Sequence, residues 1–101
     1  GETEDYGEAM QYLSRALDRQ PLKEDATQGM ILCLLRLDRA REALAVGNRY
    51  MRIHAEAGVF PSLGPVEALA EALLVTRQTG DAIQLLTDML RVLPSSQNLL
   101  E

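Results

Sequence analysis

The chain repeats part of its own sequence, and the period of about 34 residues lies in the range of known repeat architectures. Glu8-Ala9 recurs one period later as Glu42-Ala43, and Ala43-Leu44 recurs as Ala82-Ile83 after one period and a short insertion. A repeat of this length is one supersecondary unit, which buries its apolar face by stacking on its neighbours. The period therefore limits the fold to an array of similar units.

Matches between the first and third copies lie at helical spacing. When the offsets from the first to the second copy and from the second to the third copy are added, Leu13 maps onto Leu86, Leu17 onto Leu90 and Pro21 onto Pro94. Small residues such as Ala9 let a neighbouring helix approach closely, and a proline after the last turn cannot continue the helix. This period, together with these features, is typical of tetratricopeptide helix pairs. We therefore predict an all-α, right-handed solenoid of about five antiparallel helices.

Turn residues and apolar spacing set the expected helix boundaries. Gly58 is the expected C-cap of the third helix, and the longest loop follows it. Pro65 suits the first turn of the fourth helix. Gly29 lies inside the second helix, where it indicates a close helix crossing. The five predicted helices are residues 5–19, 23–37, 39–57, 65–78 and 81–94.

Composition and charge support this fold and exclude some functions. Hydrophobic residues make up 47% of the chain and are mostly Leu and Ala, which favour helices. The net charge of −5 argues against a nucleic-acid-binding domain, because binding to the phosphate backbone needs clustered Lys and Arg. Five arginines nevertheless crowd one stretch, which is either a solvated helix face or a surface for an acidic partner: Arg36, Arg39, Arg41, Arg49 and Arg52.

Side chains suited to catalysis or metal binding are scarce. Cys33 is the single cysteine and lies in an apolar run, where a small buried hydrophobe is expected. His54 is the single histidine and is expected at the surface or half-buried, so no zinc site can be assembled from histidine and cysteine. Phosphate-binding glycine motifs are absent. We predict that the chain is not an enzyme and holds no cofactor or metal.

A partner-binding groove is expected on the first helix of each pair, which lines the concave face of tetratricopeptide folds. Glu67 and Glu71 lie at i and i+4 and therefore share one helical face, which is either simply solvated or an acidic rim. The predicted partner is a basic or amphipathic helix. The predicted groove residues are Asp25, Gln28, Leu32, Leu35, Arg36, Glu67, Glu71 and Leu74.

Somewhat over half of the chain, about residues 17–74, resembles the bacterial transcriptional activator domain. The similar segments are Pro21-Leu22-Lys23-Glu24-Asp25-Ala26, Leu34-Leu35-Arg36-Leu37, Arg41-Glu42-Ala43-Leu44 with Tyr50, and Glu56-Ala57-Gly58-Val59-Phe60-Pro61-Ser62. That domain sits beside an OmpR-like winged helix in regulators of the streptomycete antibiotic type. The loop departs from the family at Leu63-Gly64, where an acidic, helix-starting segment is usual.

The resemblance implies a helical module of a transcription regulator or signalling protein that acts in dimerisation, interdomain contact or partner binding. The expected partner is protein: another domain of the same chain, a partner regulator or a second copy. This segment is not expected to bind nucleic acid or membrane. A free-standing tetratricopeptide adaptor or chaperone remains the alternative.

Domain organisation and location are the last expectations. Residues 1–94 are expected to form one helical domain. Residues 95–101 are expected to be either a polar tail, in part vector-derived, or a fragment of a further helix. No apolar run approaches the roughly 20 residues of a membrane span, and no signal peptide is visible, which favours the cytoplasm.

Overall fold

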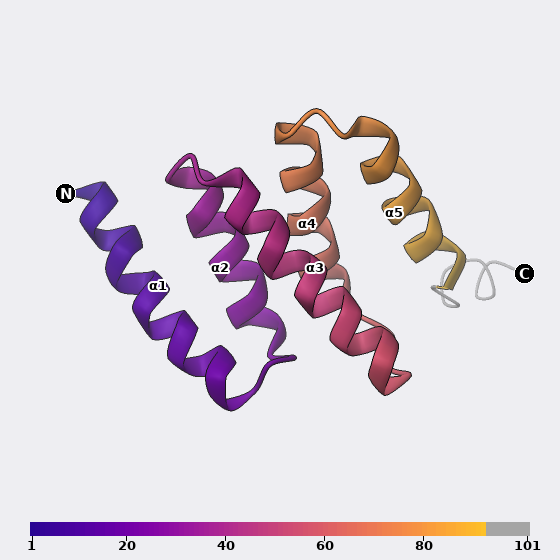
Figure 1. Cartoon of the computed structure of the whole chain (residues 1–101), viewed down its shortest axis with the longest axis horizontal. Helices are drawn as coiled ribbons and strands as arrows, with labels where there is room; N and C mark the ends of the chain where they lie inside the picture. The colour runs from indigo at the N-terminus through magenta and orange to yellow at the C-terminus, as the bar shows by residue number, and fades with distance from the viewer. Residues whose placement is uncertain (93–101) are drawn as a thin grey trace, which may run out of the picture.

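The computed structural model describes residues 1–92, and all of its regular elements are α-helices. The predicted tail and Pro94 lie outside the described residues. As Figure 1 shows, α1 and α5 lie at opposite ends of the stack and α3 crosses in front of α2 and α4. The five helices are α1 (Glu2–Arg19), α2 (Glu24–Arg36), α3 (Ala40–Ala57), α4 (Leu63–Val75) and α5 (Thr79–Val92).

The helices form two layers. Helices α2 and α4 contact each other, and each of α1, α3 and α5 packs on one or both of them. Within the described part of the chain, α1, α3 and α5 make no contact with one another. This is the stacking expected of tetratricopeptide-like helix pairs, so the predicted all-α solenoid of five helices is confirmed.

Alanine and glycine mark the places where helices approach closely. Ala43 and Ala82, the second and third copies of the repeated alanine, are 0% and 1% exposed. Ala9 in the first copy is only partly buried, because α1 packs on α2 alone. Gly29 lies against Leu13, since an added Cβ would be 3.2 Å from Leu13 Cδ1. The predicted close crossing at Gly29 is therefore confirmed.

Gly47 marks a still tighter crossing, between α3 and α4. A Cβ at this position would lie 2.5 Å from Leu69 Cδ1 and 3.1 Å from Leu69 Cβ. The middle repeat therefore has glycine because α4 leaves no space for a larger residue.

The helix ends differ somewhat from the predicted ones. Helix α1 begins at Glu2 rather than Asp5, and α5 begins at Thr79 rather than Asp81. Helix α4 begins at Leu63, after the N-cap Ser62, so Leu63 and Gly64 form its first turn instead of ending the loop. Pro65 is then the third helical residue, a position whose N–H has no intrahelical partner, so the proline removes no hydrogen bond.

Helices α2 and α4 end in the same way, at equivalent positions of the repeat. Asp38 and Arg77 have φ values of 59° and 64°, in the left-handed region. The N–H of Arg77 donates to the Leu74 carbonyl at 3.0 Å, and that of Gln78 donates to Leu73 at 2.7 Å. This left-handed closure ends α4 at Val75, before the predicted end at position 78.

Two connected clusters of buried side chains make the core. The first joins Met30, Ile31 and Leu34 of α2 to Ala43, Ala68 and Ala72, and the second consists of Leu69, Ala70, Leu73 and Ala82. Both clusters contain residues of α4, which supplies seven of the buried residues. Helix α4 is therefore the central helix, and the other helices are placed by their contacts with it or with α2.

Candidate protein-binding surfaces

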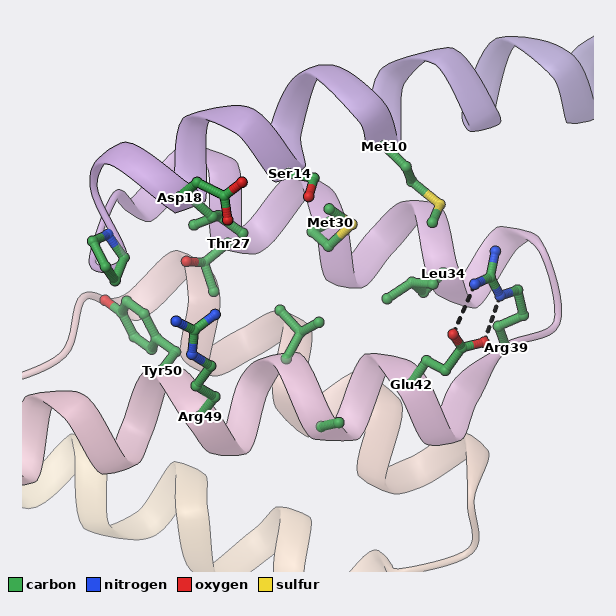
Figure 2. Close-up of a pocket in the computed structure, with 14 residues that line it drawn as sticks. Met10, Ser14, Asp18, Thr27, Met30, Leu34, Arg39, Glu42, Arg49 and Tyr50 are labelled. Carbon is green, nitrogen blue, oxygen red and sulfur yellow. Dashed lines mark hydrogen bonds and ion pairs between the residues drawn. The ribbon is translucent and has the colours of Figure 1, made fainter.

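A groove of about 380 Å³ runs between α1 and α3, over α2. It exists because α1 and α3 both pack on α2 without touching each other. Figure 2 shows α1 along one side, α3 along the other, and Met30 and Leu34 of α2 at the bottom. The lining residues are Met10, Ser14, Leu17, Asp18, Pro21, Thr27, Met30, Leu34, Arg39, Glu42, Ala45, Val46, Arg49 and Tyr50.

The floor of the groove is closed and largely apolar. Thr27, Met30 and Leu34 are 1%, 8% and 3% exposed. The Thr27 hydroxyl donates to the Lys23 carbonyl at 2.9 Å, so its polar group is satisfied within α2. A bound side chain would thus meet hydrocarbon at the bottom of the groove and polar groups at its rim.

One pair of charges on the rim is already neutralised. Nη2 of Arg39 donates to Oε1 of Glu42 at 2.7 Å, and Nε of Arg39 donates to the other carboxylate oxygen. These bonds lower the pKa of Glu42 and raise the pKa of Arg39 from their ordinary values. The Arg39–Glu42 pair is therefore an exposed ion pair of the α3 wall in which the two charges compensate each other.

Arg49 is the second cation of the groove, and among the described residues it makes no ion pair. Its side chain extends from α3 toward Thr27, below Asp18 of α1 (Figure 2). Asp18 likewise has no ion-pair partner in residues 1–92. The groove thus offers one cation and one carboxylate to a bound segment.

The groove predicted from the sequence lies instead on α2 and α4, and only part of it is available. The structure brings Arg36 and Glu71 together, with Nη1 3.8 Å from Oε1. Gln28 lies against Gly64 at the start of α4. Leu32 and Leu35 are half-buried and pack on the first core cluster. The exposed members of the predicted set are Asp25, Arg36, Glu67, Glu71 and Leu74.

The α1–α3 groove was missed because its walls come from the second helices of two successive pairs. The repeat alignment identified these helices by their buried positions, and it carried no information on the gap between them. The one available signal was the arginine-rich stretch, from which Arg39 and Arg49 line the groove.

His54 is buried and not at the surface or half-buried as predicted, with 5% of its area exposed. Its Nδ1 lies 2.8 Å from the Val59 carbonyl oxygen, so Nδ1 carries the proton and donates. The ring packs on Tyr50 at 4.4 Å between centroids. The Tyr50 hydroxyl in turn accepts from the Ser62 N–H at 3.0 Å. His54 and Tyr50 therefore hold both ends of the loop from Gly58 to Ser62.

Cys33 is half-buried on α2, and burial raises the pKa of its thiol above the ordinary value. A raised pKa keeps the thiol protonated and poorly nucleophilic. No three His, Cys, Asp or Glu side chains in residues 1–92 lie where they could hold a metal ion. Across the same residues, no helix combines the length and apolar character of a membrane span.

The family model of the bacterial transcriptional activator domain matches residues 2–74. The match extends from α1 to the last turn of α4 and so includes the whole α1–α3 groove. No curated protein and no solved structure matches the chain significantly.

Proposed function

Because the chain belongs to the bacterial transcriptional activator domain family, we propose that it is the partner-binding module of a transcription regulator. The module carries out no catalysis, and contact with DNA is left to other parts of the regulator. The family membership does not favour the alternative of a free-standing adaptor outside transcription.

The α1–α3 groove carries this proposal. It is open, has an apolar floor and presents Arg49 without an ion-pair partner in the described part of the chain. An amphipathic segment of a partner protein fits these features, with apolar side chains on Met30 and Leu34 and a carboxylate beside Arg49. Such a segment would fill the groove above its apolar floor and neutralise the unpaired cation in one step.

Site-specific photo-crosslinking in cells that produce the complete regulator tests the proposed surface. A photoreactive amino acid at Ala45, on the exposed α3 wall, is expected to give one discrete adduct. The same amino acid at Asp25, on the predicted α2–α4 face, is the control. Val46→Arg would fill the groove and should abolish the Ala45 adduct and reduce transcription of the target genes.

Arg49→Glu and Arg52→Glu form a matched pair for the charge of the bound segment. Both arginines are exposed on α3, but only Arg49 lines the groove. We expect Arg49→Glu to weaken the adduct by about tenfold and Arg52→Glu to leave it unchanged, since charge reversal matters most where the charge meets a partner.

The two photoreactive positions distinguish the two surfaces. Adducts from Asp25 alone, lost on combined Glu67→Lys and Glu71→Lys reversal, would favour the acidic α2–α4 face and a basic helical partner. Adducts from neither position would contradict the proposal of a partner-binding module.

A further inference from the structure

Tyr50 belongs both to the α1–α3 groove and to the anchoring of the loop between α3 and α4. Its side chain lines the groove, at the end where Asp18 and Arg49 also lie (Figure 2). Its hydroxyl accepts a hydrogen bond from the Ser62 N–H at 3.0 Å, at the end of the loop that begins at Gly58. Within residues 1–92, no other lining residue of the groove hydrogen-bonds to this loop. Tyr50 is therefore the direct connection between the groove and the loop.

His54, the other buried ring near the end of α3, completes this connection. The ring centroids of Tyr50 and His54 are 4.4 Å apart, and Nδ1 of His54 donates to the Val59 carbonyl at 2.8 Å. The two residues are only 2% and 5% exposed. A displacement of the Tyr50 ring would thus remove the acceptor of the Ser62 N–H and a packing surface of His54 together. Both anchors of the loop depend on the position of one ring.

The groove is the open space into which the Tyr50 ring can move. The residue is 2% exposed, so protein atoms close the sides of the ring that do not line the groove. Long side chains in helices keep to two staggered χ1 positions, near about 180° and −60°, so a displaced ring takes a discrete alternative position. An opened loop would leave the hydroxyl buried without its donor unless the hydroxyl reaches water in the groove. Tyr50 can therefore either anchor the loop or turn into an empty groove.

The anchored loop leaves one buried polar atom unsatisfied. Because Nδ1 of His54 carries the proton, Nε2 is an acceptor, and in the described part of the chain it has no hydrogen-bond partner. An unsatisfied buried acceptor disfavours the conformation that contains it. The anchored state is thus less stable than its two hydrogen bonds alone would make it, and a change beside Tyr50 can shift its equilibrium with an opened loop.

We infer that a segment bound in the α1–α3 groove fixes the loop between α3 and α4 through Tyr50. The inference rests on the proposed function for its occupant, a partner segment in this groove. Such a segment fills the space into which the ring would turn and excludes water from the hydrogen bond between Tyr50 and Ser62, so it favours the anchored state. The coupling is reciprocal, and an anchored loop therefore favours binding in the groove. Groove occupation also fixes two exposed apolar side chains of the loop, Val59 and Phe60, which are 53% and 73% exposed.

A covalent label in the groove tests this inference without the natural partner. In the complete chain, Cys33→Ala removes the single native thiol, and Asp18→Cys places a new one on the α1 wall, at the Tyr50 end of the groove (Figure 2). Reaction with N-benzylmaleimide attaches an apolar ring at this position. Hydrogen exchange of the Ser62 amide is followed by NMR before and after labelling. We expect the label to raise the protection factor of this amide by about threefold or more.

Arg15→Cys with the same label is the matched control, because Arg15 is exposed on α1 and does not line the groove. This label should leave the exchange of the Ser62 amide unchanged. In a Tyr50→Phe background, the label at position 18 should also have no effect, since the acceptor of the Ser62 N–H is gone. Circular dichroism checks that each protein keeps its helices.

An unchanged protection factor after labelling at position 18 would overturn the inference. So would an equal rise from the label at position 15, or a rise that persists in Tyr50→Phe, because the effect would then not pass from the groove through the Tyr50 hydroxyl. The photo-crosslinking at Ala45 asks whether a partner occupies the groove, whereas the covalent label asks whether occupation reaches the loop. The proposed function and this inference can therefore fail separately.

Discussion

Glycine stabilises the fold at one helical position of this chain and destabilises it at another, depending on which atoms lie beside it. Gly47 faces Leu69 across the α3–α4 crossing, whereas no side chain or neighbouring backbone lies within 4 Å of the position that a Cβ would take at Gly7. Both residues are inside helices, where alanine is intrinsically favoured by about 1 kcal/mol. The contact with Leu69 therefore decides whether glycine is required.

Gly47→Ala is expected to lower the free energy of unfolding by about 1–2 kcal/mol, because the clash with Leu69 exceeds the gain in helix propensity. Gly7→Ala is the matched control and should raise it by roughly 0.5–1 kcal/mol. Urea denaturation followed by circular dichroism measures both. An unchanged or higher stability of Gly47→Ala would show that α4 can move away from α3 at no cost.

Asp38 and Arg77 hold the same left-handed conformation at equivalent helix ends. Glycine adopts this conformation without strain, and aspartate tolerates it better than arginine does. Arg77→Gly should therefore raise the unfolding free energy by up to about 1 kcal/mol, and Asp38→Gly by less. Arg52→Gly, in the interior of α3, should instead lower it by about 1 kcal/mol. Chemical denaturation of the three variants gives the ranking, and a loss of stability in Arg77→Gly would contradict the role assigned to its φ angle.

At the scale of elements, the loop between α3 and α4 is held by side chains of α3. The Tyr50 hydroxyl accepts the Ser62 N–H, and His54 donates to the Val59 carbonyl. Both side chains are buried, so the loop conformation depends on the packing of α3 against its neighbours.

Tyr50→Phe removes the acceptor of the Ser62 N–H and keeps the ring. We expect a loss of about 1 kcal/mol in unfolding free energy and faster hydrogen exchange at Ser62, since one half-buried donor is left without its partner. Tyr12→Phe serves as the control, because Tyr12 is 74% exposed. Equal effects of the two substitutions would mean that water replaces the Tyr50 hydroxyl without cost.

At the scale of the whole molecule, the helices are connected as a linear stack. Within residues 1–92, α1 packs only on α2 and α5 only on α4, whereas α2 and α4 each pack on three helices. Stability in such a stack is approximately a sum of terms between neighbouring helices. The end helices are therefore expected to open more readily than the central ones.

Hydrogen exchange under native conditions tests this gradient. Amides of α1 and α5 should exchange with lower protection factors than those of α2 and α4, because opening an end helix breaks one interhelical contact surface and not three. Uniform protection across the five helices would indicate a single cooperative unit.

The repeat in the sequence determined the fold class, the order of the helices and the close approaches at Ala43, Ala82 and Gly29, because these follow from residue size and periodicity along one chain. The family resemblance was likewise visible in local motifs. The groove between α1 and α3 came only from the tertiary structure, since it depends on how far apart two helices lie on a shared third one. The burial of His54 and the requirement for Gly47 were decided there too. Both depend on where the atoms of neighbouring helices and loops lie, and the spacing of residues along the chain does not specify those positions.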